Sequence, residues 1–285
     1  MVSVKEYVQI KKELLKGIVE EHDVKPNLLI LEFNGDESSA SYIRGIKKDC
    51  QEIGIKCMHH NVKNANRLTT QQAVNIIEVL QDLNDFDAVI IQKPIPVNID
   101  QTALKNAIAT IQDVDGFTDY SIYDPCTPKG VIDYLEYCDY PFQQMTACVV
   151  GRSNTIGRPL AKMLLDRDCT VTVCHSKTAP DDLFDYMRDS NFVFTCISSI
   201  EEFTDGFFNT DCDVIDFGIG IGHDGKLHGN IHHSTVKYLK ENNEVNGHIV
   251  ISGTGGTGLL TRVALMENVL KAAYGCGTGK VEDNE

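Results

Sequence analysis

The chain has 285 residues, of which 42% are hydrophobic and 24% are charged, as expected for a globular protein large enough for two domains. Its net charge of −15 argues against nucleic acid or an anionic membrane as the main partner. No apolar run approaches the ~20 residues that span a bilayer, and Met1–Lys16 lacks the apolar core of a signal peptide. The ten cysteines are scattered without a Cys-x-x-Cys pair, which predicts reduced thiols in a cytoplasmic protein instead of disulfides or a zinc site.

The first half of the chain alternates helical and strand-like hydrophobic patterns. We expect helices at 4–21, 37–54, 69–83 and 102–111, another that opens after Pro125 and runs toward Tyr137, and strands at 27–33, 55–58 and 88–92. This alternation predicts a parallel α/β sheet, in which the carboxyl ends of the strands form one edge that faces ligands.

Three rigid polar loops are expected along this edge, at Gln92–Pro96, Asp113–Phe117 and Pro125–Gly130. Prolines stiffen the first and the third, and the second carries two carboxylates around a tight turn. Each can be an ordinary loop. Three of them ahead of a nucleotide-binding unit predict a cleft.

The segment 147–178 has the order of a nucleotide-binding unit: strand 147–150, a glycine turn, helix 158–167 and strand 170–173. Gly151 and Gly157 would let the backbone approach a pyrophosphate, and the helix N-terminus would supply N–H groups. The pattern is Gly-x-Ser-x-x-x-Gly, not Gly-x-Gly-x-x-Gly, so an ordinary strand-to-helix turn is the alternative interpretation.

The tip of the second strand of this unit bears on the choice of nucleotide. NAD enzymes usually place an Asp or Glu there for the ribose 2′-hydroxyl. Here the tip is His175-Ser176-Lys177-Thr178, and Arg152 follows the first glycine. The missing carboxylate favours NADP over NAD, with solvated loop side chains as the alternative.

The remainder of the chain is expected to continue a Rossmann-type half. Strands are predicted at 191–196 and 213–217, the second ending in Gly218-Ile219-Gly220, followed by an amphipathic helix at 259–274. Residues 275–285 have the composition of a disordered tail.

Five histidines late in the chain invite a metal hypothesis: His223, His228, His232, His233 and His248. They lie in a polar stretch without the tight His/carboxylate spacing of a metal site. We therefore expect solvated surface histidines and no bound metal.

A series of motifs occurs in one order along nearly the whole chain. They are Ser39-x-x-Tyr42, Glu52-Ile-Gly-Ile, Gln92-x-Pro-x-Pro, Asp113-Val-Asp-Gly-Phe, Pro125-Cys-Thr-Pro-x-Gly, Val150-Gly-Arg-Ser-x-x-Ile-Gly-x-Pro and Thr170-Val-Thr-x-Cys-His-Ser-Lys-Thr. In series they resemble the methylenetetrahydrofolate dehydrogenase/methenyltetrahydrofolate cyclohydrolase family. The resemblance implies a folate-binding catalytic domain (1–140 with a return helix in 262–285), a Rossmann-type NADP-binding domain (141–261) and a homodimer in the cytoplasm.

The resemblance also implies roles for single residues. Tyr42 would stack on the folate near the reacting carbon, Gln92 would be its polar partner, and Asp115 would hydrogen-bond the pterin. Further substrate contacts would come from Ser39, Pro94, Gly255 and Gly256. The cofactor would be held by Gly151, Arg152, Ser153, Ile156, His175, Ser176, Gly218 and Ile219, with Arg152 and Ser176 near the 2′-phosphate. The reaction would be hydride transfer from the methylene carbon to C4 of the nicotinamide, aided mainly by positioning and electrostatics.

The match departs from the family at a catalytic position. The family's lysine lies four residues after the tyrosine, on the same helical face, whereas this position is Ile46 here. Lys47 follows, but a shift of one residue rotates a helical side chain by ~100°, which should point its ammonium elsewhere. The lysine is needed for the cyclohydrolase step, and isoleucine has no group that assists proton transfer. We therefore expect weak or absent cyclohydrolase activity, while dehydrogenase activity survives, as in monofunctional members that also lack this lysine.

The substrate side departs further. Gln112 replaces a lysine before Asp-Val-Asp-Gly, the loop from Phe117 to Pro125 is shorter, and Gly229-Asn230-Ile231 replaces Gly-Asp-Val. The late loop 252–259 has lost the family's prolines and should be more mobile. These changes leave open a full bifunctional enzyme, a non-catalytic nucleotide- or folate-binding paralogue, and a dehydrogenase with another substrate.

Overall fold

The computed structural model of the chain describes residues 2–33, 37–83, 85–118, 120–242, 244 and 247–275. The chain divides into two compact units, which we name after their sheets. The three-stranded unit is Val8–Cys126 with the chain from Arg262 onward, and the five-stranded unit is the chain up to Tyr7 with Thr127–Thr261. The sequence-based boundary at residue 140 lies later than this division.

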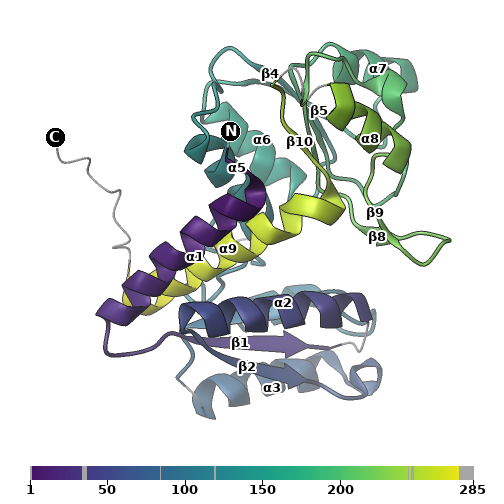
Figure 1. The fold of residues 1–285 in the computed structure, drawn as a ribbon. Coiled ribbons are helices and arrows are strands. Elements are labelled where there is room, and N and C mark those ends of the chain that lie inside the picture. Colours follow the sequence, from purple (N-terminus) through teal and green to yellow (C-terminus); the bar gives the residue numbers. More distant parts are fainter. Residues whose placement is uncertain are drawn as a thin grey trace. The chain divides into compact units, whose positions relative to one another are not determined.

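The three-stranded unit is a parallel sheet with helices on both faces. Its strands β1 (Asn27–Glu32), β2 (Lys56–Asn61) and β3 (Ala88–Gln92) lie in the order β2-β1-β3. Helices α2 (Glu37–Ile53) and α3 (Thr70–Leu83) connect them and cover opposite faces (Figure 1). The two crossovers step in opposite directions along the sheet, so right-handed connections place their helices on opposite sides. The carboxyl ends of all three strands therefore share one edge.

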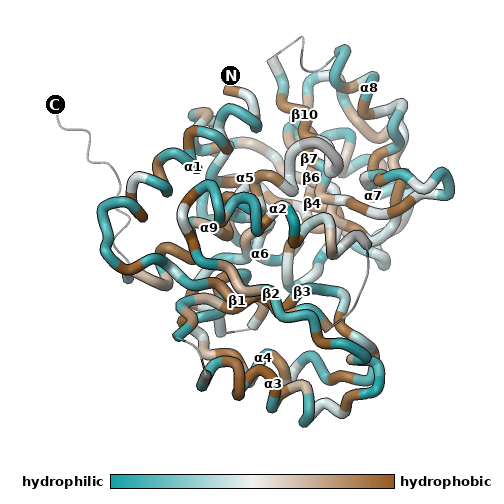
Figure 2. The backbone as a smooth tube through the Cα atoms, turned by 60° about the horizontal axis from the view of Figure 1, so that its bottom comes forward, coloured by the Kyte–Doolittle hydropathy of each residue, from teal (hydrophilic) through white to brown (hydrophobic). Residues whose placement is uncertain are grey.

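The central strand β1 is buried on both faces. Leu28, Leu29, Ile30 and Leu31 are all 0% exposed, as expected for a strand between two others and beneath helices on both sides. Figure 2 shows this apolar run as the brown stretch at β1. β2, at the edge of the sheet, contains no fully buried residue.

Three other helices contribute to this unit: α1 (Val4–Glu21), α4 (Gln101–Asn106) and α9 (Gly258–Tyr274). α1 and α9 lie side by side (Figure 1), and Lys11 Nζ is 3.7 Å from Glu267 Oε2. α9 was expected to be amphipathic, but it is buried on most of its circumference. Its buried apolar residues are Leu260, Val263, Ala264, Leu265, Met266, Val269 and Leu270.

The five-stranded unit is a second parallel sheet, in the order β10-β7-β6-β4-β5. Its strands are β4 (Thr146–Val150), β5 (Thr170–Cys174), β6 (Phe192–Thr195), β7 (Asp213–Asp216) and β10 (Val250–Ile251). Its helices are α5 (Cys126–Tyr137), α6 (Gly157–Leu165), α7 (Pro180–Arg188) and α8 (His233–Asn242), and β8 (Gly220–Ile221) with β9 (Leu227–His228) forms an antiparallel hairpin. From β4 the chain first adds β5 on one side and then β6 on the other. The carboxyl end of β4 is therefore the topological switch point, where open α/β sheets bind ligands.

The two-domain α/β class with parallel sheets is confirmed, while some elements differ from expectation. α1 and β3 have the predicted bounds, but α4 ends at Asn106 and not at 111. The chain leaves the α-helical pattern there, because the N–H groups of Ala107 and Ile108 donate to carbonyl oxygens three residues back. α7, α8 and the β8–β9 hairpin were not anticipated. The predicted tail lies outside the described residues beyond Gly275. No helix of the described chain is both long and apolar enough to cross a bilayer.

Candidate active site

The glycine turn after β4 approaches two neighbouring backbone segments closely. Gly151 has a φ of 132°, and a Cβ built on it would lie 2.4 Å from the carbonyl oxygen of Cys196. A Cβ on Gly157 would lie 2.2 Å from the carbonyl oxygen of Gly151. Both positions therefore require glycine. The bare backbone at the switch point is a cradle that fits a pyrophosphate.

Ser153 links this turn to the helix that follows it. Its Oγ accepts hydrogen bonds from the N–H groups of Ile156, at 3.1 Å, and Gly157, at 3.4 Å. The hydroxyl thus satisfies donors in the first turn of α6 that would otherwise lack a partner. Arg152, beside it, is exposed, so its guanidinium is accessible to an anion in solution.

The tip of β5 is a tight turn that holds its own shape. The N–H of His175 donates to Thr178 Oγ1 at 2.9 Å, and His175 Nδ1 accepts the N–H of Lys177 at 3.2 Å. The predicted cofactor residue His175 therefore uses one ring nitrogen to order the turn. Ser176 and Lys177 are exposed, so a hydroxyl and an ammonium lie at the strand tip in a fixed loop.

A buried carboxylate organises the end of β7, and the sequence interpretation missed it. Asp216 is 1% exposed, and its oxygens accept hydrogen bonds from Thr195 Oγ1 at 3.0 Å and from the N–H groups of Gly218, Asn230 and Ile231 at 2.7 to 3.1 Å. Burial raises the pKa of Asp216, while these hydrogen bonds oppose the shift. The network fixes the segment that carries the predicted cofactor residues Gly218 and Ile219.

Asn230 stands where the resemblance leads one to expect an aspartate. Its side-chain amide donates to the carbonyl oxygens of Ile197, at 3.0 Å, and Ser199, and its Oδ1 accepts the N–H of Ile197 at 3.1 Å. A carboxylate has no N–H to donate to these carbonyls. Asn230 therefore ties the loop after β6 to the segment after β7. Ile219, 63% exposed, extends from that segment.

In the three-stranded unit, Tyr42 is half-buried on α2. Burial, and next the negative charge of Asp115, raise the pKa of the Tyr42 phenol well above its usual value. The hydroxyl therefore keeps its proton at neutral pH and can donate a hydrogen bond. The two predicted site residues lie within electrostatic reach of each other.

Asp115 is half-buried, and burial raises the pKa of its carboxyl to about 6, with Lys93 as the main opposing influence. Desolvation of the ammonium lowers the pKa of Lys93, and the charge of Asp115 opposes that shift. Lys93 Nζ lies 5.1 Å from the centre of the Phe117 ring. The sequence interpretation missed the cation Lys93, because its position between Gln92 and Pro94 indicated only an ordinary polar loop.

The neighbouring carboxylate, Asp113, has a structural task. It is 1% exposed and accepts the N–H groups of Phe117 at 2.9 Å and Thr118 at 2.7 Å. These bonds close the turn that presents Asp115. Gly116 in the same turn has a φ of 65°, which glycine adopts without strain.

The end of β3 is tied to α2 through one carbonyl group. The oxygen of Lys93 accepts hydrogen bonds from Ser39 Oγ at 3.0 Å and from Gln92 Nε2 at 2.8 Å. Ser39 is 2% exposed, whereas Pro94, which follows a cis peptide bond, is exposed. Ser39 and Gln92 thus order the backbone of the predicted substrate loop.

Ile46 and Lys47 lie in different environments on α2. Ile46 is 0% exposed, whereas Lys47 is exposed and its ammonium lies 3.1 Å from His59 Nδ1 on β2. His59 Nε2 lies in turn 2.9 Å from the buried carboxylate of Glu32. Lys47 is therefore engaged at β2.

A buried ion pair adjoins Tyr42 and was also missed. Asp49, 1% exposed, is 2.5 Å from Nε of Arg262 on α9 and also binds Lys12 on α1. Arg262 lowers the pKa of Tyr42, against the larger effects that raise it. The guanidinium packs on Gly45, where a Cβ would lie 2.8 Å from Arg262 Nη1.

The last predicted substrate residues belong to the five-stranded unit. Gly255 and Gly256 lie in a single π-helical turn, Gly253–Thr257, ahead of α9. A Cβ on Gly253 would lie 1.9 Å from the carbonyl oxygen of Gly218. Tyr42, Gln92, Asp115, Ser39 and Pro94 all belong to the three-stranded unit.

The late histidines do not share one polar loop, as the sequence suggested. His228 lies in β9, His233 opens α8, and His248 Nδ1 lies 3.5 Å from Asp213 Oδ1 near β7. His228 is also only partly exposed. The expectation of solvated surface histidines is therefore wrong for His228.

Both parts of the chain are similar to known proteins. Residues 3–115 match "Tetrahydrofolate dehydrogenase/cyclohydrolase, catalytic domain", and residues 125–276 match "Tetrahydrofolate dehydrogenase/cyclohydrolase, NAD(P)-binding domain". The bifunctional protein FolD of Methanoculleus marisnigri is 32% identical over 280 residues, covering 94% of this chain and 95% of that protein. FolD of Nitrosomonas europaea is 34% identical over 268 residues, covering 90% and 86%. The crystal structure of the bifunctional FolD methylenetetrahydrofolate dehydrogenase/cyclohydrolase from Campylobacter jejuni superposes with a TM-score of 0.84 at 26% identity, covering 95% and 97%.

Proposed function

Because the chain belongs to the tetrahydrofolate dehydrogenase/cyclohydrolase family, we propose that it oxidises 5,10-methylenetetrahydrofolate to 5,10-methenyltetrahydrofolate in one-carbon metabolism. Bound NADP would supply the hydride acceptor for this oxidation, C4 of its nicotinamide. The observation that carries this proposal within the chain is the pairing of Tyr42 with the partly buried carboxyl of Asp115, beside the cation of Lys93. These are a neutral donor, an acceptor and a charge, suited to a polar heterocycle.

The chain's own residues bind and orient the reactants. The Gly151–Gly157 turn fits the pyrophosphate of the cofactor, while Arg152, Ser176 and Lys177 supply the polar and cationic groups for a 2′-phosphate. Asp115 accepts N–H groups of the pterin, and Tyr42 stacks on the folate and donates its phenol proton as a hydrogen bond. Holding donor and acceptor carbons in place supplies much of the rate enhancement.

Cyclohydrolase activity is weak or absent in this proposal. Hydrolysis of the methenyl bridge requires a group that moves protons to and from water, and Ile46 offers none at the position of the family lysine. Lys47 is bound to His59. A second candidate, the full bifunctional enzyme, is favoured by Lys93, because its lowered pKa leaves more of its amine neutral and available as a general base than in an ordinary lysine.

The test is a paired assay on one preparation. One reaction follows NADPH formed from methylenetetrahydrofolate, and the other follows decay of supplied methenyltetrahydrofolate above its spontaneous rate. We expect dehydrogenase activity without hydrolysis in the native chain, and about a hundredfold gain in hydrolysis in Ile46→Lys, the low end of what a positioned acid–base group contributes. Ile46→Met is the size-matched control and should gain nothing.

The remaining outcomes separate the alternatives. Native hydrolysis that disappears in Lys93→Met establishes the bifunctional enzyme. NADP binding in calorimetry without turnover of either folate establishes a non-catalytic paralogue and overturns the proposal. A melting-temperature comparison of Ile46→Lys with Ile46→Met separates lost folding from lost chemistry, because a buried lysine costs stability.

The homodimer and the cytoplasmic location are part of the same proposal. They rest on the family resemblance, and none of the nine described cysteines is in a disulfide, which is consistent with a reducing compartment. Light scattering on the purified chain would measure the mass in solution, and a mass near 31.6 kDa would contradict a dimer.

A further inference from the structure

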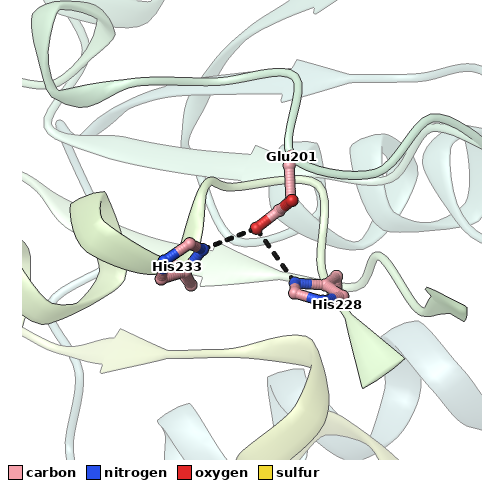
Figure 3. A group of neighbouring side chains, drawn as sticks. All are labelled: Glu201, His228 and His233. Atoms are coloured by element: carbon pink, nitrogen blue, oxygen red, sulfur yellow. Dashed lines mark hydrogen bonds and ion pairs between the residues drawn. The ribbon is translucent and has the colours of Figure 1, made fainter. Parts of the chain in front are cut away.

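Two histidines and a glutamate converge in the five-stranded unit, apart from the residues assigned above. Nδ1 of His228 lies 2.9 Å from Oε1 of Glu201, and Nδ1 of His233 lies 2.8 Å from the same oxygen (Figure 3). The three come from the loop after β6, from β9 and from the first residue of α8. Among the described residues, this is the one group of three potential metal ligands whose atoms lie within 4.8 Å of one another.

Asp224 determines how the His228 ring faces the glutamate. Its Oδ1 lies 2.9 Å from Nε2 of His228, where it can accept a proton that the ring carries on this nitrogen. In the neutral ring with its proton on Nε2, the lone pair of Nδ1 points at Oε1 of Glu201. Two lone pairs at this distance repel unless a cation lies between them, either a proton or a metal ion. A carboxylate on the outer ring nitrogen is also the usual partner of a metal-binding histidine.

The backbone presets two of the three side chains. Glu201 has a φ of 52°, uncommon for a residue other than glycine, and its N–H donates to the carbonyl oxygen of Gly229 at 2.8 Å. His228 is fixed in the hairpin, where it pairs with Gly220. Their side chains are 28% and 14% exposed, whereas that of His233 is 70% exposed. Glu201 and His228 are therefore held in place, while the exposed side of His233 leaves the cluster accessible from solvent.

We propose that Glu201, His228 and His233 bind one divalent late transition-metal ion of the zinc type, with water in the open position. Imidazole nitrogens and carboxylate oxygens hold zinc at about 2.0–2.2 Å, which puts tetrahedral ligand atoms about 3.3 Å apart. The two N–O distances of 2.8 and 2.9 Å therefore need to widen by only a few tenths of an ångström. Two imidazoles favour zinc, cobalt, nickel or copper over magnesium or calcium, which prefer oxygen ligands. The bound ion would pin the β8–β9 hairpin to the loop after β6 and to α8.

The test measures zinc and cobalt binding to the full chain, freed of any affinity tag and stripped of metal with a chelator. We expect one zinc per chain in calorimetry, a melting temperature that rises with zinc concentration, and a cobalt spectrum without thiolate bands. His228→Gln should lower zinc affinity by roughly a hundredfold and Asp224→Asn by roughly tenfold, because the second removes an outer contact. His223→Gln, on the same hairpin and outside the cluster, is the matched control and should bind as the native chain does.

The proposal would be overturned by the absence of saturable zinc binding, by thiolate bands in the cobalt spectrum, or by an affinity that His228→Gln leaves unchanged. His233→Gln guards against misfolding, because this exposed side chain can change without disturbing the core. If it lowers the melting temperature equally with and without zinc, the cluster is only a hydrogen-bonded contact. None of these readouts depends on folate turnover, so they test the metal site independently of the proposed dehydrogenase activity.

Discussion

At the scale of single residues, the proposed folate site combines polar side chains with an apolar residue on the same helix. Tyr42 and Asp115 face each other electrostatically, whereas Ile46 is an apolar core residue. Ionised Asp115 consequently lowers the free energy of unfolding, because burial disfavours its charge. A residue that opposes stability in this way is typical of functional sites.

Replacement of Asp115 by asparagine should therefore stabilise the chain in a pH-dependent way. The folded pKa of about 6 lies above the usual 3.8, so the native carboxyl contributes favourably while protonated and loses that contribution as the pH rises through 6. Urea unfolding should give Asp115→Asn an advantage of about 3 kcal/mol at pH 8 that is largely lost near pH 4. The KM for the folate should rise in the same variant. A stability difference independent of pH would contradict this assignment.

At the scale of secondary-structure elements, two glycines within helices differ in whether a side chain would have room at their positions. Gly17 in α1 and Gly45 in α2 both lie inside long helices, where glycine is less favourable than alanine. A Cβ on Gly17 would meet nothing within 4 Å, but one on Gly45 would meet the guanidinium that pairs with Asp49.

The two positions should respond oppositely to alanine. Gly17→Ala should raise the free energy of unfolding by about 0.5–1 kcal/mol, the difference in helix propensity. Gly45→Ala should lower it by roughly 1–3 kcal/mol, because the added methyl group displaces Arg262. Chemical denaturation of both variants measures these changes. Equal gains would show that Arg262 moves aside freely.

Local patterns predicted elements well where the hydrophobic period was strong. The predicted bounds of α1 and β3 match the structure, whereas α7 was missed because Met187 is its only fully buried residue. The family was predictable from the order of its motifs. The cluster at Glu201 was not, because its partners His228 and His233 come from other elements distant in sequence and no spacing rule reports such a convergence.

At the scale of the whole molecule, a preference for NADP over NAD should appear as a difference in how much each nucleotide stabilises the folded chain. A ligand that binds only the folded chain stabilises it by roughly 2.7 kcal/mol at a hundredfold excess over its Kd. Thermal unfolding should therefore shift upward by several degrees with NADP and by less with NAD at the same concentration. Arg152→Ala, which removes an exposed cation near the expected 2′-phosphate, should narrow that difference. Equal shifts with both nucleotides would contradict the preference inferred from the tip of β5.

The order of the units along the chain has a consequence during synthesis. The five-stranded unit draws nearly all its residues from one continuous stretch, Thr127–Thr261, but the three-stranded unit is completed only by α9. Until that last helix leaves the ribosome, Asp49 lacks Arg262 and the carbonyl of Val114 lacks the amide of Asn268, which donates to it at 2.9 Å. The segment translated first therefore finishes folding last, and the nascent chain carries it incomplete through almost the whole of its translation.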